Sequence, residues 1–213
     1  MFYSLASTGI LLTKAVLALY SVLVVAVVVE RLLTLNQVSG QERSGYKAVI
    51  GVLTAGRSTS IAAALAQAAR YQASPSCVAL LVAGETLKRL PPHAALAAEQ
   101  TFASRAAGLR RGLPAIASVA STAPYVGLFG TVLGILAAFH TIAMTGQTGA
   151  SIVAGGVTEA LVTTAMGLAV AVPSVLAYNW LTGVVNDVTM QAEANAREYV
   201  AYLLAAANEA VAP

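Results

Sequence analysis

One stretch of the sequence limits the possible folds more than any other. From Gly112 to Asn186, 75 consecutive residues contain a single residue that is charged at neutral pH, Glu159. A soluble globular domain carries about 25% charged residues, whereas this whole chain carries 10%. Because about 20 apolar residues cross a bilayer as a helix, the stretch is long enough for two spans. It predicts an all-α integral membrane protein.

A further apolar run near the N-terminus, Ala15 to Val29, predicts the first span. At 1.5 Å per residue its 15 residues fall short of a hydrocarbon core of about 30 Å. The helix must therefore extend over its flanks, and we predict transmembrane helix 1 at residues 14–35. No small-residue cleavage site follows the run, so we expect it to stay uncleaved. The predicted interface anchors are Lys14, Glu30 and Arg31.

The charge-poor stretch divides at the short uncharged segment 145–151, which contains two glycines. This predicts transmembrane helix 2 at 113–144 and helix 3 at 152–185, with a turn between them. Pro124 and Pro173 lie inside these helices and are predicted to kink them. Small residues at four-residue spacing predict close helix contacts. The packing positions are Gly127, Gly130, Gly134 and Gly167.

The remaining segments are more polar. Residues 36–112 open with NQVSGQERSG, whose composition favours a turn, and continue with helical apolar spacing that prolines interrupt. We predict a helical region there and an amphipathic helix at 186–213.

Charge predicts the orientation. Residues 36–112 contain nine basic and three acidic residues, and by the positive-inside rule this region is cytoplasmic. The C-terminal helix then lies on the same side, while a short N-terminal segment, 1–13, and the 145–151 turn lie outside.

Other classes of function find no support in the sequence. The basic residues form no Arg-rich run and have no aromatic residues interleaved with them, so nucleic acid is not an expected partner. Cys77 is the only cysteine, which excludes an intrachain disulfide and leaves a buried small residue as the simplest interpretation. We recognise no phosphate loop, nucleophile motif or metal cluster, and predict neither an enzyme nor a metal site. His93 is expected at the surface and His140 at the membrane interface, with a proton relay at His140 as the alternative.

Glu159 is the candidate functional residue. An ionised carboxylate inside a bilayer costs several kcal/mol, and such residues usually face a protein interior or a water-filled path. Glu159 lies about 10 Å inside the predicted third helix. Thr163 follows on the same helix face, whereas Thr164 points about 140° away. A Glu that only hydrogen-bonds a neighbouring helix, or snorkels outward, is the alternative.

Two motifs resemble a known family. APYVGLFGTVLGI in the second span and GGVTEALVTTAMGLAVAVPSVLAYN in the third are similar to the MotA/TolQ/ExbB proton-channel family, and most similar to its ExbB/TolQ branch. By motif position, Thr131, Glu159 and Thr164 match the family's proton-pathway residues. Gly155-Gly156 replaces the family's usual Pro-Gly.

The resemblance implies a homo-pentamer in the bacterial inner membrane, with protons as the transported ion and no cofactor. The pore would hold a dimeric ExbD- or TolR-like partner, each chain with one span and an essential Asp. A TonB- or TolA-like protein would carry the work to the outer membrane. Two alternatives remain open: a structural scaffold without ion flux, and a flagellar MotA-like stator.

Overall fold

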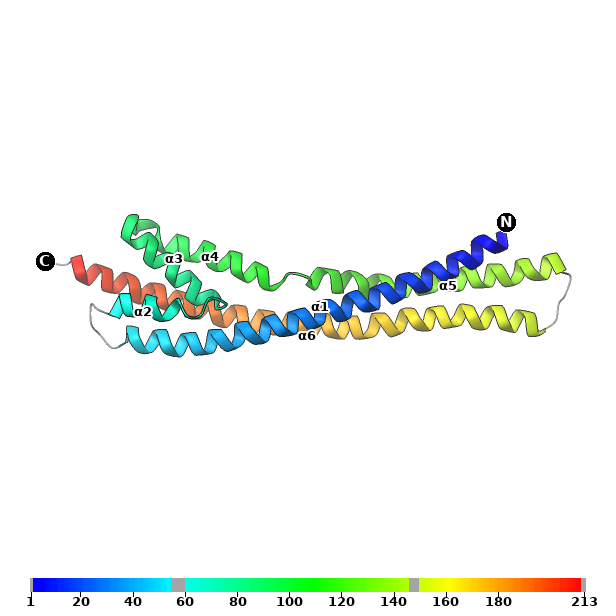
Figure 1. Cartoon of the computed structure of the whole chain (residues 1–213). Helices are drawn as coiled ribbons and strands as arrows, with labels where there is room; N and C mark the ends of the chain where they lie inside the picture. The colour runs from blue at the N-terminus through cyan, green and yellow to red at the C-terminus, as the bar shows by residue number, and fades with distance from the viewer. Residues whose placement is uncertain (1, 55–59, 146–149, 212–213) are drawn as a thin grey trace. The chain divides into compact units, whose positions relative to one another are not determined.

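The described residues of this computed structural model, 2–54, 60–145 and 150–211, are almost entirely helical (Figure 1). The predicted all-α fold is confirmed, since these residues contain no strand. They divide into two compact units. In chain order the helices are α1 (Phe2–Leu53), α2 (Ser60–Ala68), α3 (Pro75–Arg89), the 3-10 helix η1 (Pro91–His93), α4 (Ala94–Leu109), α5 (Leu113–Thr145) and α6 (Ala150–Val211).

The first unit, called the membrane unit below, comprises Met1–Glu30 and Gly112–Leu181. It contains the first part of α1, all of α5 and the first part of α6. Each of these three helices is long and apolar enough to cross a membrane, which confirms the prediction of three spans. Many large apolar side chains of this unit are exposed, as expected for surfaces that face lipid or another chain.

Small residues bring α5 and α6 together inside the membrane unit. A Cβ added to Gly127 would lie 2.9 Å from the carbonyl oxygen of Thr163 and 3.1 Å from Gly167 Cα. One added to Gly134 would lie 2.7 Å from Ala160 Cβ. The two backbones thus approach as closely as only glycine and alanine permit, the packing expected where no hydrophobic effect drives helix association.

The first helix differs from the predicted element at both ends. It begins at Phe2, so residues 2–13, predicted as a separate segment, are helical, and it continues through NQVSGQERSG to Leu53. The expected turn at this segment was wrong. In this part of α1, buried positions recur at alternating spacings of three and four residues, so one face of the helix is buried. The stability gained by packing this face outweighs the local preference for a turn. These positions are Leu35, Val38, Glu42, Gly45 and Val49.

The start of α5 is set by a glycine. Gly112 precedes α5 and has a φ of +84°, a conformation that costs glycine little and other residues more. Pro124 and Pro173 both lie within helices that continue past them, and a kink at either stays a prediction. Residues 152–185 and 186–211 form one uninterrupted helix. Most of the predicted turn, residues 146–149, lies outside the described residues.

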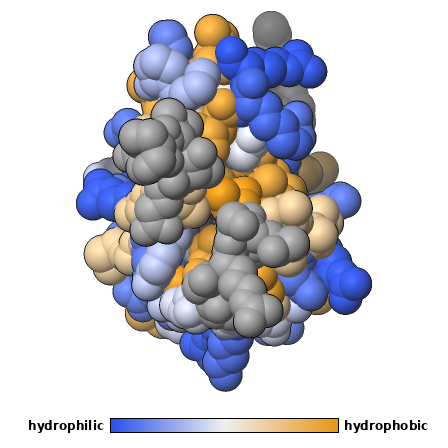
Figure 2. Space-filling model, turned by 90° about the vertical axis from the view of Figure 1, so that its left-hand side faces the viewer, coloured by the Kyte–Doolittle hydropathy of each residue, from blue (hydrophilic) through white to orange (hydrophobic). Residues whose placement is uncertain are grey.

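The second unit, called the polar unit below, comprises Arg31–Arg111 and Thr182–Pro213. Ser74 caps α3, because its hydroxyl accepts a hydrogen bond from the Cys77 N–H at 3.1 Å. Seen from the left-hand side of Figure 1, hydrophilic residues lie around the rim of this unit and hydrophobic residues between them (Figure 2). Its core includes Val49, Leu53, Leu80, Phe102, Tyr199 and Leu203.

Candidate functional site

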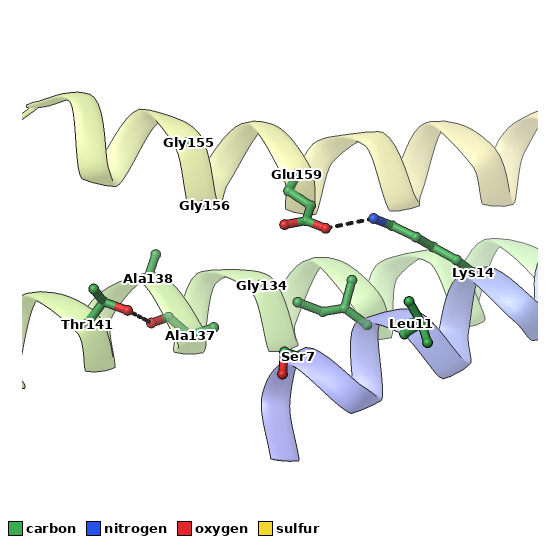
Figure 3. A pocket seen from close by; sticks show the side chains of 11 residues that line it. Ser7, Leu11, Lys14, Gly134, Ala137, Ala138, Thr141, Gly155, Gly156 and Glu159 are labelled. Atoms are coloured by element: carbon green, nitrogen blue, oxygen red, sulfur yellow. Dashed lines mark hydrogen bonds and ion pairs between the residues drawn. The ribbon is translucent and has the colours of Figure 1, made fainter. Parts of the chain in front are cut away.

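Glu159 forms an ion pair with Lys14. The Lys14 ammonium on α1 donates to Glu159 Oε1 on α6, with 2.7 Å between Nζ and the oxygen (Figure 3). The Glu159 side chain is 57% exposed and that of Lys14 is 31% exposed. The carboxylate that the sequence shows as isolated therefore has a counter-charge inside the same chain.

The pair lies beside a cavity of about 270 Å³ in the membrane unit. Three helices line it, and most of the lining residues are small (Figure 3). Lys14 and Glu159 are the only ionisable residues among them. The lining is Ser7, Ile10, Leu11 and Lys14 of α1, Gly134, Ala137, Ala138 and Thr141 of α5, and Gly155, Gly156 and Glu159 of α6.

Thr131 and Thr164 meet between α5 and α6. Their hydroxyl oxygens are hydrogen-bonded to each other, and either can be the donor. The Thr131 hydroxyl also lies 3.2 Å from the Gly127 carbonyl oxygen, on its own helix. Both side chains are partly buried. The structure thus joins two of the three predicted pathway residues directly, although they are 33 positions apart.

Thr163 has a different environment. It is completely buried, and its hydroxyl donates to the Glu159 carbonyl oxygen at 3.2 Å, one turn back along the helix. A Cβ on Gly130 would lie 2.4 Å from Thr163 Cγ2, so this methyl fills the space that the glycine leaves. Thr163 therefore contributes to helix packing.

Within one chain, the Glu159 carboxylate and the threonine pair have separate partners. Glu159 is bonded to Lys14 on α1, whereas Thr164 bonds Thr131 on α5. Five residues of helix separate Glu159 from Thr164, a rotation of about 140°. A continuous path through both places would need a movement of side chains, a second chain or water.

The other predicted anchors differ from Lys14. Arg31 is buried in the polar unit, where it is only 7% exposed and its Nη1 lies 3.4 Å from the Gly108 carbonyl oxygen. Glu30 is exposed. Lys14 follows twelve helical residues of α1, so it does not mark the start of the helix. An anchoring role for any of the three stays a prediction.

Sequence reasoning missed a buried carboxylate in the polar unit. Glu42 is 1% exposed, and its carboxylate accepts hydrogen bonds from the Ser74 hydroxyl at 2.6 Å, the Ser76 hydroxyl, and the Asn195 amide at 2.9 Å. These contacts join α1, α3 and α6. The available signal was the position of Glu42 on the apolar face of its helix, between Val38 and Val49.

Two neutral groups adjoin this cluster. Burial raises the pKa of the Cys77 thiol, and burial likewise raises the pKa of the Tyr199 hydroxyl. Cys77 is fully buried, as the sequence predicted. Across the described residues no group of three or more His, Cys, Asp or Glu side chains could hold a metal ion.

Comparisons with known proteins give the same family as the motifs. Residues 82–194 match the MotA/TolQ/ExbB proton channel family, which covers the candidate residues of α5 and α6. A protein named biopolymer transport protein ExbB from Neisseria gonorrhoeae is 47% identical over 93 residues, 44% of this chain and 42% of the relative. The Tol-Pal system protein TolQ of Pseudomonas aeruginosa is 52% identical over 71 residues, 33% of this chain and 31% of the relative. The matches thus span less than half the length of these relatives.

Proposed function

Since the chain belongs to the MotA/TolQ/ExbB proton channel family, in its ExbB/TolQ branch, we propose that it conducts protons as a stator subunit of an inner-membrane motor complex. The family and the three spanning helices support an energy-transducing membrane subunit. Proton flow through the complex would energise transport at the outer membrane or maintenance of the envelope.

The chain lies in the bacterial inner membrane as a multi-pass protein. Its orientation is part of the proposal. The nine basic residues between positions 36 and 112 favour a cytoplasmic polar unit, which leaves the N-terminus and the segment between α5 and α6 outside.

The observation that carries the proposal is the exposed carboxylate of Glu159. In this single chain, 57% of the side chain is uncovered, in a unit that exposes many large apolar side chains. A carboxylate facing lipid is costly, so this face must line water or another protein chain. A carboxylate placed where water or a partner reaches it can accept and release protons, which a structural scaffold does not require.

The Thr131–Thr164 pair gives a second polar place in the same unit. A hydroxyl both donates and accepts a hydrogen bond. Two adjacent hydroxyls can therefore form part of a continuous chain of hydrogen bonds. In the proposed homo-pentamer, copies of Glu159 and of the threonine pair would surround a central pore. A dimer of ExbD- or TolR-like single-span partners would occupy that pore, and its membrane Asp would exchange protons with them. A TonB- or TolA-like protein would transmit the motion.

The test uses the full chain, produced together with its single-span partner and reconstituted in liposomes that contain a pH-sensitive dye. Glu159→Gln keeps the size of the side chain and removes its acid, so proton uptake under an imposed gradient should fall at least about tenfold. Thr164→Val removes the hydroxyl paired with Thr131 and should reduce uptake by a similar factor.

The matched control is Thr163→Val, one residue away, where the hydroxyl bonds only a backbone carbonyl within its own helix. This variant should conduct protons like the wild type. Full proton uptake by Glu159→Gln, in complexes that assemble normally, would refute the proton-path proposal and favour the scaffold. Similarity to ExbB and TolQ proteins already disfavours the flagellar alternative.

A further inference from the structure

We propose that the cavity between α1, α5 and α6 is a water-filled vestibule, through which protons from one side of the membrane reach Glu159 within a single chain. The inference rests on the proposed function of Glu159 and adds the route by which its carboxylate meets water. The vestibule is the cavity of about 270 Å³ together with the residues that line it.

The vestibule lies near the ends of all three helices. Ser7 is five residues from the start of α1, Thr141 is four residues from the end of α5, and Gly155 is five residues from the start of α6. At 1.5 Å per residue, these offsets are about 6–8 Å of helix. Water can therefore enter from this end of the bundle without crossing the apolar middle of the membrane.

The lining carries polar groups that can hold water. Lys14 and Glu159 contribute an ammonium and a carboxylate, and Ser7 and Thr141 contribute hydroxyls. A purely apolar cavity stays dry, whereas a cavity that offers about two to four hydrogen-bonding partners for each water is hydrated. A water molecule occupies about 30 Å³ in the liquid, so a volume of about 270 Å³ has room for several.

Small residues keep the space between these polar groups open. Along α1 the lining extends from Ser7 to Lys14, which is seven residues or about 10 Å of helix. Five of the lining residues are glycine or alanine and fill little of the space. A Cβ added to Gly155 would meet nothing within 4 Å, so this glycine borders open space. The vestibule thus extends from near the helix ends to the ion pair.

Glu159 lies where the vestibule can supply it with protons. Its carboxylate lines the cavity, and Figure 3 shows it between α6 and α5, directed towards the Lys14 ammonium. Acids inside a membrane usually face a water-filled cavity, and chains of such groups mark proton routes. The side chain is also 57% exposed on the single chain, so a partner chain can contact it while the vestibule keeps it in contact with water.

The first test detects water by labelling thiols, in the full chain in lipid nanodiscs and in a Cys77→Ala background. The reactive species is the thiolate, which forms readily only in water, so a small charged methanethiosulfonate reagent reacts slowly with a thiol in lipid. Ala137→Cys places a thiol in the lining of the vestibule. It should react within about tenfold of the rate of Ser104→Cys, an exposed position in the polar unit.

A second substitution shows that the reagent arrives through the vestibule. Gly155→Leu fills the open space and should slow labelling of Ala137→Cys at least about tenfold. Gly183→Leu is the matched control, because a Cβ there also meets nothing within 4 Å, but the residue does not line the cavity. Slow labelling of Ala137→Cys without either substitution would overturn the inference, since lipid chains would then fill the space. If Ala137→Cys does not fold, Gly155→Cys reports on the same space.

Proton uptake in liposomes, with the single-span partner present, tests the route itself. In complexes that assemble normally, Gly155→Leu should reduce uptake at least about fivefold, whereas Gly183→Leu should conduct like the wild type. If Glu159→Gln abolishes uptake but Gly155→Leu does not reduce it, the vestibule is not the route and the proposed function stands. If uptake survives in Glu159→Gln, the proposed function is wrong and the vestibule delivers no protons to this acid.

Discussion

At the scale of single residues, the environment of a polar side chain depends on the partners that surround it. Glu159 and Glu42 are both glutamates on long helices, yet the first is exposed beside an ammonium and the second is buried among three uncharged donors. The residue type alone predicts neither environment. What each acid can do follows from the groups that its helix brings within hydrogen-bonding distance.

Cys77 gives a prediction at this scale. Because burial raises the pKa of its thiol, little thiolate is present at pH 8.5, and labelling by a maleimide should be at least about tenfold slower in the folded chain than in the unfolded chain. An exposed thiol made by Ser104→Cys in a Cys77→Ala background is the control and should react quickly. Equal rates for the two thiols would show that Cys77 is accessible.

The same raised pKa predicts how stability depends on pH. A thiol whose pKa is higher in the folded state stabilises the fold fully below its unfolded value of about 8.5, and this contribution is lost as the pH rises towards the folded value. The polar unit should therefore unfold more easily at alkaline pH. Cys77→Ala should weaken this dependence.

At the scale of helices, two kinds of contact hold the elements together. In the membrane unit, glycines let α5 and α6 approach until backbone atoms touch. In the polar unit, Glu42 joins three helices through hydrogen bonds, next to an apolar core. Glycine spacing in the sequence predicted the close contact of α5 with α6. The hydrogen bonds of Glu42 could be found only once the packing of the helices was known.

Gly127→Ala tests the close approach. The added Cβ would lie 2.9 Å from the Thr163 carbonyl oxygen, a backbone atom that cannot move alone, so the variant should lose about 1–3 kcal/mol of stability. Thermal unfolding in detergent, followed by circular dichroism, measures this. Gly183→Ala on α6 is the matched control, because its Cβ would meet nothing within 4 Å, and it should be neutral or slightly stabilising.

Glu42→Ala tests the buried cluster. It leaves the hydroxyls of Ser74 and Ser76 and the amide of Asn195 without their acceptor, which should destabilise the polar unit by about 3 kcal/mol. Labelling of Cys77 on heating reports the opening of this unit. Glu85→Ala removes only an exposed ion pair with Lys88 and should change stability by less than about 0.5 kcal/mol. Equal melting of the two variants would contradict a structural role for Glu42.

At the scale of the whole molecule, the chain combines an apolar unit with a more polar one, and its charge distribution predicts which side of the membrane each end reaches. We expect a cysteine at Ser104, in a Cys77→Ala background, to react with a membrane-impermeant maleimide only in inside-out vesicles. A cysteine at Ser4 should react only in intact spheroplasts. The opposite pattern would reverse the proposed orientation.

The sequence by itself determined the membrane class, the number of spans and the family. These properties depend on the length of apolar runs and on motifs such as TEALVTTA, which are local along the chain. It also indicated Glu159, because a lone charge in an apolar stretch is visible without any fold. The predicted start of the first helix, at Lys14, was wrong, because α1 begins at Phe2 and apolar residues also precede Lys14 along the chain.

Only the tertiary structure decided which side chains are partners. Lys14 and Glu159 are 145 positions apart, and Thr131 and Thr164 lie on different helices. Helical periodicity gives the direction of a side chain relative to its own helix, but the rotation and offset between two helices depend on how their surfaces interdigitate. For this reason the sequence could identify the acid of the site, whereas the lysine that neutralises it emerged from the packing of α1 against α6.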